Sequence, residues 1–288
     1  MAKQRLNGFS IMRNVDASVT EGFGREWSTF TQGESELEAN ERQRQFDQYF
    51  HIFPWDNLPA NAEGLDGGCG TGRWATLVAQ RVGRLHLLDA SDGALSVARR
   101  NLANAKNVSF HLASVSEIPL PDRSLDFAYS LGVLHHIPDT LDALKHIATK
   151  LKPNAPLLVY VYYALDNRPH WFRAIWRASN AARLVISKFP HWLKLVTSQL
   201  IAATVYWPLA RTCALLSRLG IATRSIPLEA YKDCSFYMMR TDAYDRFCTS
   251  LEKRFTRAEI EQMLREAGFD RIVFSDQVPF WCAVARKV

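Results

Sequence analysis

The sequence predicts an α/β protein built on a parallel β-sheet, and three observations support this prediction. Four glycines lie within residues 67–72, between a short apolar segment and the start of a helical pattern. Asp89 closes the next apolar segment, about twenty residues further along the chain. Apolar runs of strand length alternate with helical patterns as far as residue 161, which is the order of βαβ units.

The expected strands of this sheet are residues 62–66, 84–88, 108–112, 124–130 and 156–161, followed near the C-terminus by 269–275 and 278–284. Helical patterns lie between them at 71–81, from Ser91 onward, and from Asp139 or Thr140 to about residue 152. A capping box, Thr256 with Glu259, opens a last helix that Gly268 closes. We expect Ser91 to cap its helix.

The glycine cluster is typical of a loop that holds a ligand. Glycine is kept where the backbone takes a positive φ or where a ligand touches the backbone. Gly68, Gly70 and Gly72 give the spacing G-x-G-x-G, and Arg73 stands where a dinucleotide fingerprint needs its third glycine. No Gly-Lys-Ser/Thr follows, so a P-loop is excluded. The sequence therefore predicts a ligand site at the carboxyl edge of the sheet.

The run Leu65-Asp66-Gly67-Gly68-Cys69-Gly70-Thr71-Gly72 resembles motif I of the class I S-adenosylmethionine (SAM) dependent methyltransferases. Only Gly67 departs, because an aliphatic residue is usual there. The resemblance covers about residues 58–165 and 255–288. Within the class, the sequence is similar to methyltransferase type 11, the branch with the ubiquinone and menaquinone methyltransferases. It implies a Rossmann-like seven-stranded sheet, parallel with one antiparallel strand near the C-terminus. It also implies SAM as methyl donor and S-adenosylhomocysteine as product.

The resemblance implies a cofactor site made of Asp66, Gly68, Cys69, Gly70, Gly72, Asp89, Ala90, Ser114, Val115 and Ser130. Asp89 stands where the family has the acid that holds the ribose of SAM, and a capping role is its alternative. Ser114 replaces the acid that usually binds the adenine amino group. Contact with the base would then fall to Ser114 and the backbone of Val115.

His135 and His136 follow the fourth strand, in a run that resembles the family's motif beside the transferable methyl group. Histidine is a suitable general base near neutral pH, so both are candidate catalytic residues, with His135 favoured. Packing or helix capping is the equal alternative. A carbon or amine nucleophile would need no strong base. We expect no metal, because the five cysteines include no CxxC pair.

The N-terminal residues 1–57 are expected to form a lid and a helix. Phe23 and Trp27 would cover the SAM site or the substrate entrance, or else attach a tail to the surface. A polar helix with an apolar stripe is expected at residues 34–50. The cofactor domain would then comprise residues 58–165 and 252–288, with an α-helical insertion after strand five, residues 166–251, as the acceptor cap.

The insertion is both apolar and basic. Helical spacing connects Trp171, Ile175, Ala178, Ala182, Val185 and Phe189, and a second helix carries Trp192, Val196, Gln199, Ala203 and Trp207 between Pro190 and Pro208. Tyr162, Tyr163, Trp171, Trp176, Trp192 and Trp207 could line an aromatic acceptor pocket, although most such tryptophans are expected in the core. Arg168, Arg173 and Arg177 would suit a phosphate, a carboxylate or an anionic headgroup. The uncharged run 195–210 is too short for a membrane span.

The distribution of charge and the cysteine content indicate the kind of partner and the cellular location. Of the net charge of +6, residues 163–220 contribute +7, with eight Lys and Arg against Asp166. This local block favours an acidic partner or a membrane surface. Five scattered cysteines indicate reduced thiols in a cytoplasm, and no signal peptide is expected. We therefore expect a cytoplasmic protein with peripheral contact at the inner membrane surface.

Three functions remain at this point. The first is O-methylation of a small or lipid-like acceptor by a SAM-dependent methyltransferase, which the aromatic and apolar insertion favours. The second is an RNA methyltransferase, since the basic block suits phosphates, although no RNA-binding module is recognisable. The third is a SAM-binding protein without turnover. Nucleic acid is the less favoured partner, and the sequence leaves the oligomeric state open.

Overall fold

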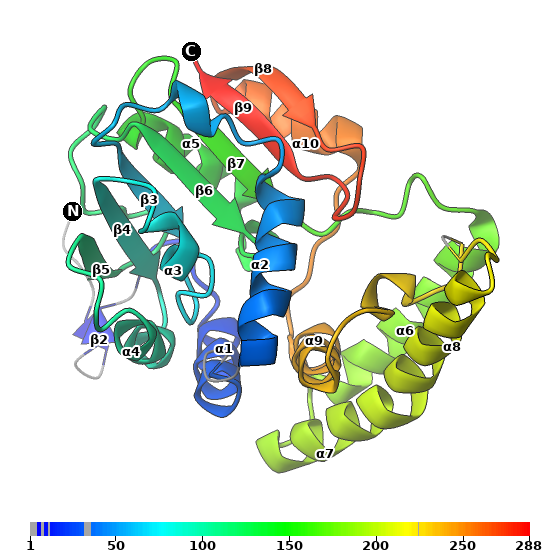
Figure 1. The fold of residues 1–288 in the computed structure, drawn as a ribbon. Coiled ribbons are helices and arrows are strands. Elements are labelled where there is room, and N and C mark those ends of the chain that lie inside the picture. The colour runs from blue at the N-terminus through cyan, green and yellow to red at the C-terminus, as the bar shows by residue number, and fades with distance from the viewer. Residues whose placement is uncertain (1–4, 7–8, 11, 32–35, 224) are drawn as a thin grey trace. The chain divides into compact units, whose positions relative to one another are not determined.

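The computed structural model describes residues 5–6, 9–10, 12–31, 36–223 and 225–288 (Figure 1). The chain forms two compact units. The first comprises Met1–Glu34, Arg42–Ala164 and Leu251–Val288, and the second comprises Ser35–Glu41 and Leu165–Ser250. The unit boundaries at 164/165 and 250/251 lie one residue before the bounds expected for the insertion, 166–251, and Ser35–Glu41 also belongs to the second unit.

The first unit contains the expected seven-stranded sheet, in the order β5-β4-β3-β6-β7-β9-β8 (Figure 1). The strands are β3 (Glu63–Gly67), β4 (Arg84–Asp89), β5 (Val108–Leu112), β6 (Phe127–Leu131), β7 (Pro156–Tyr160), β8 (Phe269–Phe274) and β9 (Ala283–Lys287). Strands β3 to β7 run parallel, and β9 is antiparallel to both neighbours. The Rossmann-like fold class is confirmed.

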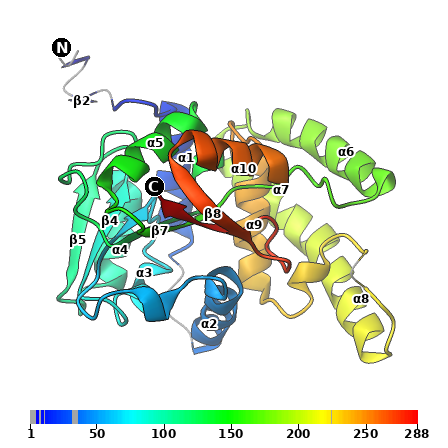
Figure 2. The ribbon, with the colours of Figure 1, turned by 90° about the horizontal axis from the view of Figure 1, so that it is seen from above.

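Helices cover both faces of this sheet, which explains why its central strands are apolar on both sides (Figure 2). One face packs against α5 (Thr140–Lys150) and α10 (Arg257–Glu266). The other packs against α2 (Glu36–Phe50), α3 (Ala75–Val78) and α4 (Asp92–Asn101). Ser91 caps α4, and Thr256 with Glu259 forms the capping box of α10, both as the sequence predicts.

Two elements of this unit are shorter or shifted. The helix expected at residues 71–81 is reduced to α3, because Gly72 has a positive φ of 74° and continues the loop. The last strand is β9 rather than residues 278–284. Pro279 cannot donate a ladder hydrogen bond, and the chain turns there before it pairs with β7.

The N-terminal part contains a helix that the sequence did not indicate. After the two-residue strands β1 (Arg5–Leu6) and β2 (Phe9–Ser10), helix α1 spans Ala17–Thr29. The Asp16 carboxylate accepts hydrogen bonds from the amides of Ser18 and Val19 and so caps α1. A 3₁₀ turn, η1 (Trp55–Asn57), leads from α2 to the sheet.

The second unit is helical. Its elements are α6 (His170–Ile186), α7 (His191–Ile201), the π-helical turn η3 (Ala202–Tyr206), α8 (Trp207–Arg218), the 3₁₀ turn η4 (Glu229–Tyr231) and α9 (Phe236–Cys248). The helix expected to end at Pro208 continues to Arg218. The π-helical turn η3 ends two residues before Pro208, which itself cannot donate a helical hydrogen bond.

The continuous helix His191–Arg218 has 28 residues, with a mean hydropathy of 1.3 over its most apolar window, and is long and apolar enough to cross a membrane. It is the single helix of this kind within the described ranges. This apolar helix is longer than the sequence indicated. Length and composition alone are weak evidence for a span, since the core helix of a soluble protein passes the same test.

The expectation that most insertion tryptophans belong to the core is wrong for three of the four. Trp171, Trp192 and Trp207 are exposed, while Trp176 is half-buried beneath Arg246. Helical spacing identifies residues on one side of a helix, but it does not say whether another element covers that side. In these helices, residues other than the tryptophans, such as Ile186 and Ala202, are the buried ones.

Candidate active site

The glycine loop after β3 takes the conformation that its composition requires. Gly68, Gly70 and Gly72 all have positive φ values, 86°, 53° and 74°. A Cβ on Gly68 would lie 2.4 Å from the Val133 side chain, so no other residue fits there. The amides of Gly68 and Cys69 donate to the Leu88 carbonyl of the neighbouring strand at 2.8 and 3.0 Å. The loop is therefore held at the carboxyl edge of the sheet.

Asp89 joins this loop to the end of β4. Its Oδ2 accepts a hydrogen bond from the Gly70 amide at 2.9 Å, and its Oδ1 accepts one from the Ser91 amide at 2.8 Å. Burial raises the pKa of the Asp89 carboxyl, and the amide hydrogen bonds oppose that effect. Each carboxylate oxygen keeps a second lone pair, so Asp89 can still accept from two ligand hydroxyl groups.

Asp66 is more deeply buried than Gly68 and Gly70 of the glycine loop. Its side chain is buried, and the Tyr129 hydroxyl donates to its Oδ2 at 2.9 Å. Burial raises the pKa of Asp66 to about 8, with the Asp89 charge adding to the effect and the Tyr129 hydrogen bond opposing it. The Ser130 hydroxyl donates to the Gly67 carbonyl at 2.7 Å and ties β6 to β3. Asp66 and Ser130 thus connect strands beneath the loop.

The other predicted cofactor residues lie around the same edge. Ser114 is buried, and its hydroxyl accepts from the Ser116 amide at 3.1 Å, within the loop after β5. Val115 and Ser130 border Gly67, within 3.7 Å of where its Cβ would lie. Ala90 is partly exposed beside Asp89. Burial raises the pKa of the Cys69 thiol well above its usual value, so this cysteine is no thiolate nucleophile.

His135 is fully buried after β6, in the 3₁₀ turn η2 (Leu134–His136). The Tyr162 amide approaches its Nδ1 at 3.4 Å, and the Tyr162 ring stacks on it at 3.8 Å between centroids. An amide can only donate, so Nδ1 is the unprotonated nitrogen and Nε2 carries the proton. Burial, with the charges of His136 and Arg254, lowers the pKa of His135 well below its ordinary value. His135 therefore stays neutral, with its basic nitrogen occupied.

His136 has the opposite tautomer. Its Nδ1 lies 2.6 Å from the Leu251 carbonyl, which can only accept, so Nδ1 carries the proton. In the neutral ring, Nε2 then holds the basic lone pair. The Phe23 ring lies edge-on to His136 at 5.0 Å between centroids. The tautomers favour His136 over His135 as the base, and a catalytic role for either histidine stays a prediction.

Helix α1 contacts the glycine loop and η2 directly. Trp27 lies beside Gly70, 3.5 Å from where a Cβ on that glycine would be, and Gly24 lies against Ser91 and Gly93. Phe23 stacks on Trp27 at 6.2 Å, with an interplanar angle of 11°. The two aromatic residues singled out in the sequence therefore lie at the predicted site, whereas a lid function stays a prediction.

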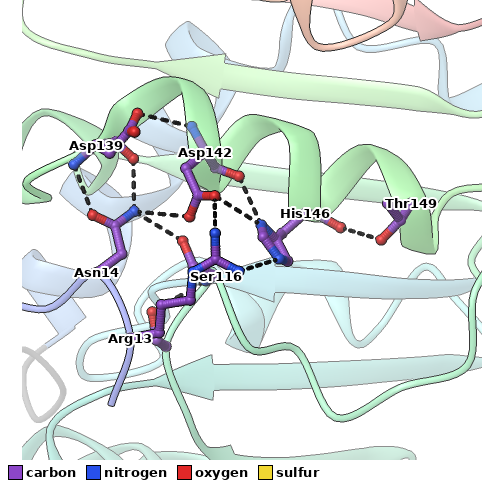
Figure 3. A network of polar contacts seen from close by, with 8 residues as sticks. Arg13, Asn14, Ser116, Asp139, Asp142, His146 and Thr149 are labelled. Carbon is purple, nitrogen blue, oxygen red and sulfur yellow. Dashed lines mark hydrogen bonds and ion pairs between the residues drawn. The ribbon is translucent and has the colours of Figure 1, made fainter. Parts of the chain in front are cut away.

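A polar network that sequence reasoning missed anchors the segment before α1 (Figure 3). The Asn14 side-chain amide donates to the Asp139 carbonyl at 2.7 Å and to the Ser116 hydroxyl at 2.9 Å, while its oxygen accepts from the Asp139 amide at 2.7 Å. Arg13 reaches Asp142 at 2.5 Å. Asn14 has a positive φ of 55°, which asparagine tolerates.

Of the insertion residues, Arg173 contacts His170 at 3.0 Å, and the Arg168 guanidinium lies over the Phe172 ring at 5.2 Å. Arg177 is exposed. These contacts lie within the second unit, so an acceptor-binding role for the three arginines stays a prediction. Over the described ranges of the chain, no group of three His, Cys, Asp or Glu could hold a metal ion.

Residues 65–159 match the family described as "Methyltransferase domain". An uncharacterized methyltransferase of Mycobacterium bovis is 30% identical over 149 residues, which are 51% of this chain and 70% of that protein. A demethylmenaquinone methyltransferase of Bacillus licheniformis is 30% identical over 105 residues, 35% of this chain. The match spans 45% of that relative's length, so the chain covers less than half of it.

A solved structure supports the fold. The SAM-dependent methyltransferase from Methanosarcina mazei has a TM-score of 0.50 and 16% sequence identity, with 82% of this chain and 98% of that chain covered. At this identity the likeness concerns the fold alone. The sequence match to the Mycobacterium bovis protein, by contrast, covers more than two thirds of that relative. The family match over residues 65–159 includes the glycine loop, Asp89 and η2.

Proposed function

This chain belongs to the S-adenosylmethionine-dependent methyltransferases, and we propose that it transfers the methyl group to a hydroxyl of a small or lipid-like acceptor. The observation that carries the proposal is the hydrogen bond between Asp89 and the Gly70 amide, which joins the two motif positions that this family uses for its cofactor. The confirmed family thus agrees with the expected donor, SAM.

The residues present fit this cofactor. Asp89 has acceptor capacity left for the two ribose hydroxyls, and the loop at Gly70 exposes backbone that a larger residue would obstruct. Val115 and Ser114 border the place where the adenine would lie. SAM supplies a methyl group on a sulfonium, which is already activated for transfer. The remaining task of the protein is to orient the acceptor, exclude water and remove a proton.

His136 is the group best suited to take a proton from a hydroxyl acceptor. Its protonated Nδ1 is fixed by the Leu251 carbonyl, so its Nε2 is the basic nitrogen. His135 supports the turn through Tyr162, and its carbonyl accepts from the Lys253 amide at 3.0 Å. Phe23 and Trp27 of α1 shield the same region from water.

The lipid-like acceptor class rests on one relative and on the composition of the insertion. The Bacillus licheniformis relative is described as acting on demethylmenaquinone, and the second unit of this chain is rich in apolar and aromatic residues. As part of the proposal, residues 166–251 cap the acceptor. We also propose a cytoplasmic location with peripheral contact at the inner membrane surface.

A labelling experiment tests the proposed function. Purified protein and methyl-labelled SAM are mixed with cell extract, and label is followed into organic-soluble, aqueous small-molecule, RNA and protein fractions. We expect label in the organic or small-molecule fraction, and none with Gly70→Val, whose β-branched side chain would be strained at a positive φ. Label that appears equally with Gly70→Val would contradict the cofactor assignment.

The acid-free basic stretch favours RNA as the second candidate acceptor. Label that enters the RNA fraction would replace the lipid-like acceptor with this alternative. If no fraction takes label while calorimetry shows SAM binding, the remaining candidate, a SAM-binding protein without turnover, would replace both. The three outcomes are therefore distinguishable in one experiment.

A further inference from the structure

The chain has no acidic residue between Asp166 and Glu229. The same stretch contains nine basic residues: Arg168, Arg173, Arg177, Arg183, Lys188, Lys194, Arg211, Arg218 and Arg224. It comprises all of α6, α7, η3 and α8. Most protein surfaces mix charges of both signs, so a stretch of one sign over three helices selects an anionic partner.

The long helix His191–Arg218 has one buried and one exposed side. The buried side is formed by Ser198, Ala202, Tyr206, Ala210 and Cys213, at spacings of four, four, four and three. The exposed side is formed by Trp192, Val196, Leu200, Ala203 and Trp207, at spacings of four, four, three and four. In α7, Ser198 lies about 200° around the helix axis from both Val196 and Leu200, so the buried and exposed residues of α7 lie on opposite sides.

Helix α6 also exposes apolar residues. These are Trp171, Ile175, Ala178, Ala182 and Val185, at spacings of four, three, four and three. Arg183 and Ile186 each directly follow one of them and are buried, and Arg183 donates to the carbonyls of Thr249 and Ser250 at 2.9 and 3.1 Å. Both helices pack against α9. We call the two exposed sets the apolar stripes of α6 and α7–α8.

These stripes are unusual for a soluble surface. Trp192 is 65% exposed, Leu200 59% and Val185 59%. An amphipathic helix normally buries its apolar side and hydrates its polar side. Contiguous exposed apolar residues on two helices therefore indicate a surface that something else covers.

We propose that the apolar stripes of α6 and α7–α8 bind an anionic lipid bilayer. The exposed tryptophans suit the headgroup level of a membrane, where an apolar ring and a polar N–H are both accommodated. Arg177, Lys188 and Arg218 are exposed and would attract anionic headgroups. No acidic residue within residues 167–228 opposes this attraction.

The helix lies along the membrane surface and does not cross it. Arg211, in the middle of α8, donates to the carbonyls of Lys232 and Cys234 at 3.0 and 2.8 Å. His191 at the start of α7 bonds to the Tyr244 hydroxyl at 3.1 Å. A spanning helix would lose these contacts, whereas a helix in the interface plane keeps them and inserts only its exposed side.

Vesicle co-sedimentation of the full chain tests this proposal independently of methyl transfer. We expect binding to vesicles of mixed phosphatidylcholine and phosphatidylglycerol, weak binding to phosphatidylcholine alone, and loss of the difference at high salt. Trp192→Ser with Val196→Ser and Leu200→Ser should weaken binding roughly tenfold or more. The matched control is Leu112→Ser with Val273→Ser, two residues of similar exposure, 48% and 55%, outside the second unit.

A second variant tests the electrostatic part. Arg177→Glu with Lys188→Glu should reduce binding to the mixed vesicles to the level seen with phosphatidylcholine alone. Circular dichroism shows that the helices are retained in each variant. Calorimetry with SAM, unchanged in all variants, separates this proposal from a failure of the proposed function. Equal binding of the triple variant and the wild type, or no preference for anionic vesicles, would overturn the proposal.

Light scattering distinguishes a second copy of this chain from a bilayer as the occupant. The proposal expects a monomeric mass at all concentrations in the absence of vesicles. A dimer that forms with rising concentration and disappears in the triple variant would assign the stripes to self-association instead.

Discussion

Asp66 and Asp89 lie at the same edge of the sheet but face different partners. Asp66 is buried against Tyr129, whereas Asp89 accepts the amides of Gly70 and Ser91 and keeps acceptor capacity for a ligand. Burial raises the pKa of both carboxyls, but only Asp89 has backbone amide donors that oppose the effect. Asp89 is therefore the better candidate for a direct cofactor contact.

Asp89→Ala should weaken SAM binding roughly tenfold or more, because hydrogen bonds to a charged group are lost and the Gly70 amide loses its acceptor. Titration calorimetry measures the change. Asp92→Ala is the matched control, since Asp92 lies three residues further on and makes only an exposed 3.8 Å ion pair with Arg99. Unchanged SAM affinity in Asp89→Ala would show that the ribose assignment is wrong.

His136→Gln should lower kcat by about 10²- to 10⁴-fold if the acceptor is a hydroxyl, because the variant has no basic nitrogen. The labelled organic or small-molecule fraction serves as the assay, and SAM affinity should be unchanged. His135→Gln is the comparison, with a smaller loss of kcat, since the Tyr162 amide occupies the unprotonated nitrogen of His135. Equal losses in the two variants would argue against His136 as the base.

At the scale of elements, α1 owes its position to a short polar segment and not to its own apolar residues. Asn14 bonds to both the amide and the carbonyl of Asp139, at the N-cap of α5, and to Ser116 in the loop after β5. The segment thereby connects two loops of the sheet edge. Phe23 and Trp27 follow on α1 and contact η2 and the glycine loop.

Asn14→Ala should increase hydrogen exchange in α1 and weaken SAM binding several-fold, because the four hydrogen bonds of the Asn14 side chain are lost. Mass spectrometry resolves the exchange by segment. Thr29→Ala, at the far end of α1, removes only a local hydrogen bond to Arg25 and should leave both quantities unchanged. Unaltered exchange in Asn14→Ala would mean that other contacts hold α1.

In the second unit, Arg183→Leu should lower the free energy of unfolding by about 2–4 kcal/mol, since the carbonyls of Thr249 and Ser250 lose a buried charged donor. Urea denaturation followed by circular dichroism measures this. Arg177 on the same helix is exposed, so Arg177→Leu should change the free energy of unfolding by less than about 0.5 kcal/mol. Equal effects would show that the buried hydrogen bonds contribute nothing.

At the scale of the whole molecule, Asp66 should affect stability with the opposite sign from most carboxylates. Its pKa is raised to about 8 in the fold, so between about pH 4 and 8 the folded state binds more protons than the unfolded state. Its contribution to stability is therefore fully present at low pH and is lost as pH rises through about 8. The pH dependence of the unfolding free energy is therefore to be measured without bound SAM.

Asp66→Asn should flatten the fall in unfolding free energy between pH 6 and about 8, measured by denaturation across that range. Asp122→Asn is the control, because Lys150 holds the pKa of exposed Asp122 below its usual value. Asp122 is ionised in both states above pH 6, so its removal leaves the slope in this window unchanged. An unchanged slope in Asp66→Asn would contradict the raised pKa.

Local sequence patterns were sufficient to predict the carboxyl edge of the sheet and its glycine loop. The loop at Gly68, Gly70 and Gly72 could be predicted from the sequence, because glycine is the residue type that adopts a positive φ without steric cost. Capping residues such as Ser91 and Thr256 likewise act within three positions of themselves. The segment at Asn14 could not be predicted, since its partners Ser116 and Asp139 lie more than 100 residues away.

The sequence by itself determined the family, the seven-stranded fold, the glycine loop and the acid at the end of β4, because each depends on short-range backbone chemistry or on a motif. Tertiary structure decided which histidine keeps a basic nitrogen, since the backbone groups of Tyr162 and Leu251 fix the two tautomers. It also decided that the stripes with Trp171 and Trp192 face outward. Periodicity assigns residues to one side of a helix, and only packing determines which side is covered.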